Sequence, residues 1–160
     1  MITFKKILIG VDNSKFADYA AKAGFELAQK FEAHVGLVHI VEPAYIPAPV
    51  ADSTIGMPIE PAINPAIEME IMNAQDKVSD DILANTISKY AGNLEVTNFT
   101  DYGSTADGIL NCAKEFEADL IVVGTHSRSG LDRLFMGSVA ENVVRHSPVP
   151  VLVVPLNESE

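Results

Sequence analysis

The stretch DLIVVGTHSRSGLDRLFMGSVAENVVRHSPVPVLVVP, residues 119–155, is the most informative part of the chain for its architecture. It begins with a short apolar run, DLIVVG, of the kind found in strands that are buried on both faces of a parallel sheet. A loop rich in glycine and serine follows, then a helix from about Ser138 to His146, and then a strand bounded by Pro148 and Pro155. Strand, loop, helix and strand in this order indicate a βαβ unit.

The chain before this unit repeats the same alternation. Two further apolar runs, residues 6–11 and 34–41, predict buried strands, and the alternating residues 94–100 predict a strand with one less buried face. Helical segments separate these strands. Five strands alternating with four helices predict an α/β fold, in which a doubly wound parallel sheet has helices on both faces.

Apolar residues at helical spacing predict the helices and their buried faces. The first helix follows the capping residues 12–14, the second runs from near Ile67 to about Tyr90, and the third opens at Ser104, which has capping-box spacing to Asp107. The residues expected to face the core are Phe16, Ala20, Ala23, Leu27 and Phe31 in the first helix, Ile71, Ala74, Val78 and Ile82 in the second, and Ile109, Cys112, Ala113 and Phe116 in the third.

The length of 160 residues suits one domain, which we expect to span residues 1–160. Six of the nine prolines lie between Pro43 and Pro65. Because proline neither continues a helix nor donates to a sheet ladder, we expect a long loop at about residues 43–65. Its role is open between a mobile insertion and a segment that contacts a partner.

The formal net charge of −11 disfavours non-specific binding to nucleic acid or to an anionic membrane. No apolar run approaches the roughly 18–20 residues that a membrane-spanning helix needs. The N-terminal residues lack a signal-peptide pattern, so we expect a cytoplasmic protein. The lone Cys112 excludes an internal disulfide and, on an apolar helix face, is expected to be a small core residue.

The loop after residue 124 is a candidate phosphate site, because ligands of open parallel sheets bind at the carboxyl ends of strands. Gly124 allows the backbone to approach a phosphate closely, and Ser138 with the free N–H groups of its helix can receive an anion. An ordinary alternative stays open, since Ser138 and Glu141 also form a capping box. Further hydroxyl and cationic groups come from Thr125, Ser127, Ser129 and Arg128.

Three parts of the sequence resemble the universal stress protein family. They are residues 124–154, the opening ILIGVDNS at residues 7–14, and the strand ending LVHI at residues 37–40. The resemblance implies an adenine nucleotide alpha hydrolase-like fold with strand order 3-2-1-4-5. It also implies a homodimer, for which we expect the edge strand from Val149 to Val154 to pair with its copy in a second chain.

ATP-binding members of this family carry the motif G-x2-G-x9-G-[S/T]. Gly124, Gly137 and Ser138 fit this motif, whereas Ser127 stands in place of its second glycine. The resemblance therefore implies ATP, or ADP or AMP, as ligand, accompanied by Mg²⁺. It implies contacts to adenosine from Val11, Asp12 and Ile40, to the ribose and phosphate path from Val123 and Gly124, and to the phosphates from Ser127, Arg128, Gly137, Ser138 and Val139.

Three functions are compatible with the sequence. The leading hypothesis is an ATP-binding regulatory or stress-response homodimer that presents a surface to a protein partner. The serine at position 127 motivates a nucleotide-independent dimeric adaptor instead. A slow ATPase has support from the nucleotide site alone, because no histidine is tied to a nucleophile, and His39 is expected to be a core histidine with its hydrogen bonds satisfied.

Overall fold

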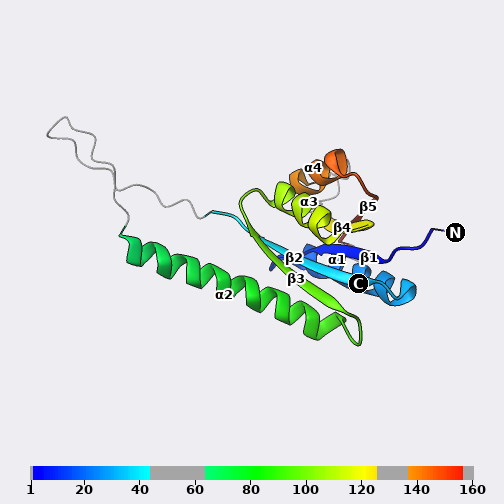
Figure 1. Ribbon diagram of the computed structural model, residues 1–160, viewed down its shortest axis with the longest axis horizontal. Helices are drawn as coiled ribbons and strands as arrows, with labels where there is room; N and C mark the ends of the chain where they lie inside the picture. Colours follow the sequence, from blue (N-terminus) through cyan, green and yellow to red (C-terminus); the bar gives the residue numbers. More distant parts are fainter. Residues whose placement is uncertain (1, 44–63, 126–136, 157–160) are drawn as a thin grey trace.

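A five-stranded sheet forms the centre of the molecule. The computed structural model describes residues 2–43, 64–125 and 137–156. Neighbouring strands are all parallel, in the order β3-β2-β1-β4-β5, which confirms the predicted class and strand order and places the last strand at a sheet edge (Figure 1). The strands are β1 (Lys6–Gly10), β2 (His34–Val41), β3 (Val96–Tyr102), β4 (Leu120–Thr125) and β5 (Val151–Pro155).

In the part of the chain that the structure describes, four helices cover the two faces of this sheet. Side chains of α1 and α2 share one buried apolar cluster with one face of the sheet, and side chains of α3 and α4 share a second cluster with the other face. In Figure 1, α3 and α4 lie above the sheet and α2 lies below it. The helices are α1 (Lys15–Phe31), α2 (Pro65–Tyr90), α3 (Thr105–Phe116) and α4 (Ser138–His146).

The buried face of α1 consists mostly of small residues. A Cβ added to Gly24 would lie 2.6 Å from Cδ1 of Ile9, so α1 packs close to the sheet at this point. Of the predicted stripe, Ala20 is fully buried, and Ala23, Leu27 and Phe31 are partly buried and pack against the core cluster, so the prediction is confirmed for these four residues. The fully buried contact itself lies to one side of that stripe. The buried residues are Ala17, Ala20, Ala21, Gly24, Phe25 and Ala28.

The buried face of α2 also differs from the prediction. Ser79, Leu83 and Thr86 are buried, whereas Ala74 and Val78 are exposed. The first half of α2 extends past the end of β2 (Figure 1), so its apolar stripe has no sheet beneath it. Of the predicted stripe, Ile82 is the residue that packs against the core cluster.

The other predicted elements agree more closely with the structure. All four residues expected inside on α3 are buried. The side chain of Ser104 makes no capping hydrogen bond, so the predicted capping box is wrong, and the neighbouring Thr105 hydroxyl donates to Glu42 instead. The strand β3 begins two residues later than expected, since Leu94 closes a turn by donating its N–H to the carbonyl of Ala91.

The structure also bears on the expected absence of a membrane-spanning helix and on the proline-rich segment. Among the residues described, no helix has the length and apolar character to cross a membrane. Most of the proline-rich segment lies outside the described residues, and α2 begins at its last proline, Pro65, with the Asn64 side chain accepting from the N–H of Ala66.

Candidate functional site

A cavity of about 730 Å³ opens at the carboxyl ends of β1, β2 and β4. The strand order reverses beside β1, because the chain passes from β1 to β2 on one side and later returns to β4 on the other. This is the switch point at which ligands bind to open parallel sheets. The lining residues are Gly10, Val11, Asp12, Ser14, Phe16, Ala17, Val38, His39, Ile40, Val41, Glu42, Ile71, Ala74, Gln75, Val78, Thr105, Ile109, Val123, Gly124 and Val139.

Most predicted site residues that the structure describes meet at this cavity. Thr125 does not line it, but its buried Oγ1 accepts a hydrogen bond of 3.1 Å from the N–H of Gly137 and so ties the end of β4 to the start of α4. Ser138 is exposed at the first position of α4. Ser127 and Arg128 lie outside the described residues. The predicted residues that line the cavity are Val11, Asp12, Ile40, Val123, Gly124 and Val139.

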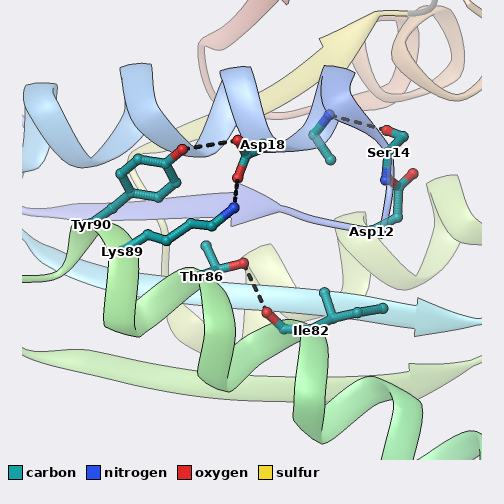
Figure 2. Close-up of polar contacts among 8 residues, drawn as sticks. Asp12, Ser14, Asp18, Ile82, Thr86, Lys89 and Tyr90 are labelled. Carbon is teal, nitrogen blue, oxygen red and sulfur yellow. Dashed lines mark hydrogen bonds and ion pairs between the residues drawn. The ribbon is translucent and has the colours of Figure 1, made fainter.

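The turn between β1 and α1 is held by local hydrogen bonds. Oδ1 of Asp12 accepts from the N–H of Ser14 at 2.7 Å, and Oγ of Ser14 accepts from the N–H of Ala17 at 3.2 Å (Figure 2). The N–H of Val11 donates to the carbonyl of Val38 at 2.9 Å, which continues the sheet pairing beyond β1. The Asp12 carboxylate is therefore held at the cavity by its own turn while Ser14 caps the helix.

Gly124 allows β4 and α1 to approach each other. A Cβ at this position would lie 2.6 Å from the carbonyl oxygen of Phe16, a distance that no side chain can occupy. The obstacle is backbone and not a movable side chain. Gly124 is thus required for packing at the cavity wall whatever the ligand is.

His39 joins the cavity to a buried polar group on α2. Its Nδ1 lies 2.9 Å from Oγ of the fully buried Ser79, and that Oγ lies 2.8 Å from Oγ1 of Thr100. Burial lowers the pKa of His39, and the nearby Asp12 charge opposes this shift. The expectation of a satisfied core histidine is thus correct for Nδ1 alone, because the half-buried ring also lines the cavity.

The first half of α2 supplies a cavity wall that sequence reasoning assigned to the core. Ile71, Ala74 and Val78 line the cavity, with Gln75 beside them. Their helical spacing signalled an apolar neighbour. It did not show whether that neighbour was a sheet or an open cavity.

The composition of the lining limits what the cavity can bind. Apolar side chains dominate it, and a few polar side chains join them, an arrangement that suits a largely apolar ligand with a few polar groups. Within residues 2–43, 64–125 and 137–156, no cluster of three His, Cys, Asp or Glu side chains could hold a metal ion. Cys112 lies outside this lining, and burial raises the pKa of its thiol to about 11, which confirms a core role.

Comparison with known proteins identifies the family of the chain. The sequence model of the Universal stress protein family matches residues 3–155. A universal stress protein of Methanocaldococcus jannaschii is 31% identical over 159 residues, which cover 98% of this chain and 85% of that protein.

Solved structures of universal stress proteins share the fold. One from Lactobacillus plantarum is 25% identical with a TM-score of 0.70, and the match covers 96% of this chain and 99% of that one. A universal stress protein in complex with cAMP has 22% identity and a TM-score of 0.67, covering 96% and 98% of the two chains. One from Archaeoglobus fulgidus in complex with dAMP has 21% identity and a TM-score of 0.58, covering 96% and 98%.

Proposed function

The chain belongs to the universal stress protein family, and on this premise we propose that its cavity binds an adenine nucleotide, with ATP as the ligand and Mg²⁺ on its phosphates. In this proposal the protein acts in the cytoplasm as a nucleotide-responsive regulator. The observation that carries the proposal is the cavity at the switch point, which combines apolar walls with the Asp12 carboxylate at the end of β1.

The shape of the site suits the three parts of a nucleotide. Val11 and Ile40 offer apolar surface to a base at the ends of β1 and β2. Asp12 can accept hydrogen bonds from ribose hydroxyls, since among the described residues its side chain accepts from the N–H of Ser14 through Oδ1 and a carboxylate has further acceptor sites. The phosphates would then extend toward β4 and α4.

The start of α4 supports the phosphate end of this arrangement. Its N-cap is Gly137, and no side chain among the described residues caps the helix. Within the described part of the chain, the first N–H groups of α4 therefore have no capping side chain, and the helix dipole would favour an anion there. The cAMP and dAMP complexes of related proteins have adenine and phosphate in common, which supports the same chemistry here.

The first test is to denature freshly purified protein, identify any released nucleotide by mass spectrometry, and measure Mg-ATP binding by calorimetry. The Asp12→Asn variant keeps an oxygen for the Ser14 N–H but loses the charge, and we expect about tenfold weaker binding. Asp107→Asn makes the same chemical change at an exposed position of α3 outside the cavity and serves as the control. Protein that is empty and fails to bind added adenine nucleotide would contradict the proposal.

The homodimer is part of the same proposal. At the edge of the sheet, β5 pairs with β4 on one side, and the side chains of Val151, Leu152 and Val153 are partly buried. A second chain could continue the ladder from this edge about a two-fold axis. Light scattering after size exclusion measures the mass directly. A dimer that does not bind nucleotide would favour the adaptor function instead.

A further inference from the structure

The polar side chains of the cavity differ in how far the protein satisfies them. Ser14 caps α1, and Thr105 donates to Glu42 at the rim. His39 uses Nδ1 for Ser79, and within the described part of the chain Nε2 has no hydrogen-bond partner. His39 therefore retains hydrogen-bonding capacity on a ring that lines the cavity.

The position of the His39 ring is fixed from three elements. The ring belongs to β2, Ser79 belongs to α2, and Thr100 belongs to β3. Ser79 is completely buried, and its Oγ joins Nδ1 to Oγ1 of Thr100 by contacts of 2.9 Å and 2.8 Å. A buried polar pair of this kind holds an imidazole in one orientation, as the supporting groups of functional histidines do.

We propose that His39 is a ligand-contacting residue, whose Nε2 forms a hydrogen bond with the adenosine part of the nucleotide and whose ring is positioned by Ser79. This inference rests on the proposed function. It adds to that function a residue that forms a hydrogen bond with the nucleoside. It also assigns the Ser79–Thr100 pair the role of orienting the His39 ring.

The strand order indicates which part of the nucleotide His39 contacts. β2 and β4 flank β1 on opposite sides. The available N–H groups of α4 follow β4, so phosphates at α4 lie on the far side of β1 from His39. Ile40, the next residue of β2, and Asp12, at the end of β1, also line the cavity, and the Asp12 charge acts on the His39 ring. The His39 side is therefore the nucleoside side.

The charge state of His39 agrees with this assignment. Burial lowers the pKa of the ring, so near neutral pH the imidazole is uncharged. A neutral imidazole can donate or accept one hydrogen bond at Nε2. It suits a base nitrogen or a ribose hydroxyl, whereas a phosphate is better matched by cations or N–H groups.

Two substitutions separate the two ring nitrogens. In His39→Asn the shorter amide can replace Nδ1 at Ser79 but offers nothing at Nε2, whereas in His39→Gln the longer amide can reach the place of Nε2. We expect His39→Asn to weaken binding of adenosine, AMP and ATP by the same factor of about ten. We expect His39→Gln to keep affinities within about threefold of the unchanged protein, with a lower melting temperature because Ser79 keeps Thr100 but loses His39 as a hydrogen-bond partner.

The outcomes distinguish this inference from the proposed function. If the unchanged protein binds no adenine nucleotide, the proposed function fails. If it binds and His39→Asn binds equally well, the inference alone is wrong. A loss that grows from adenosine to ATP would assign His39 to the phosphates and also overturn the inference.

A measurement on the unchanged protein covers the case in which a variant fails to fold. In protein labelled with ¹⁵N-histidine, adding AMP should shift the His39 Nε2 resonance. The Nδ1 resonance should change little, because the hydrogen bond between Nδ1 and Ser79 is kept. An unchanged Nε2 resonance at saturating AMP would overturn the inference.

Discussion

The two halves of α2 are covalently continuous but have different environments. The second half is anchored, with Leu83 and Thr86 buried and with Lys89 and Tyr90 both donating to the Asp18 carboxylate on α1 (Figure 2). The first half lines the cavity and leaves Met69 and Val78 largely exposed. One helix thus forms part of the core at one end and a wall of the cavity at the other.

His39 and Ser79 mark the boundary between these halves. Ser79 is the first fully buried residue along α2, and of the residues before it Ile71, Ala74, Gln75 and Val78 line the cavity. Apolar residues in the two halves should therefore respond to different measurements. Changes in the second half should lower the stability of the fold, and changes in the first half should weaken ligand binding.

The largest expected effect belongs to the anchored half. Leu83 is 3% exposed within the core cluster, so Leu83→Ala should lower the free energy of unfolding by about 2–5 kcal/mol through lost burial and a cavity. Urea denaturation followed by circular dichroism measures this loss. A change below about 1 kcal/mol would mean that the second half of α2 is not anchored as described.

A smaller effect on stability and a clear effect on binding belong to the first half. Val78 is 51% exposed and lines the cavity. Val78→Ala should change the free energy of unfolding by less than about 0.5 kcal/mol and weaken nucleotide binding by about threefold. Calorimetric titration beside urea denaturation gives both numbers. Val144→Ala, at a similarly exposed valine of α4 outside the cavity, is the matched control.

The smallest expected effect lies at the boundary and depends on pH. The pKa of His39 is lower in the folded protein than its ordinary value of 6.5, because burial disfavours the charged ring. The unfolded chain then binds more protons, so stability falls as pH drops below about 6.5 and continues to fall until the folded pKa is passed. His39→Asn should remove this part of the pH dependence. Equal pH profiles of the two proteins in urea denaturation would contradict it.

The strand pattern of the sheet could be predicted from sequence because burial on both faces leaves an unbroken apolar run. This holds for β1, β2 and β4, whose side chains are almost all buried. The start of β3 was placed two residues early. Leu94 is apolar, like a strand residue, but packs against the core from a turn. The apolar character of Leu94 therefore predicted its burial correctly but its secondary structure wrongly.

The helix faces were harder to predict, for two physical reasons. In α1 the closest contact with the sheet is made by small residues, Gly24 among them, while the larger Leu27 and Phe31 pack beside it. In α2 the predicted stripe faces a cavity, which attracts the same apolar residues as a core does. The side-chain size that fits at a helix–sheet contact and the position of a cavity both depend on the assembled fold, so neither can be predicted from one helix alone.

The candidate site was predictable where it follows strand ends. The ends of β1, β2 and β4 supplied Asp12, Ile40 and Gly124, because parallel strands all end at one edge of the sheet. The contribution of α2 could not be found this way, since its residues are distant in sequence and carry no motif. His39 was assigned to the core because Ser79, its buried partner, cannot be paired with it from one sequence.

The central position of β1 has a consequence for synthesis of the chain. β1 pairs with β2 on one side and with β4 on the other, and the N–H of Lys5 donates to the Asp119 carboxylate across 114 positions of sequence. While the ribosome makes the residues between β2 and β4, one edge of β1 has no partner. Ile7, Leu8 and Ile9, which are fully buried in the finished sheet, lie on that edge strand. The nascent chain therefore carries an open, apolar strand edge for most of its synthesis, the kind of surface that molecular chaperones protect from aggregation.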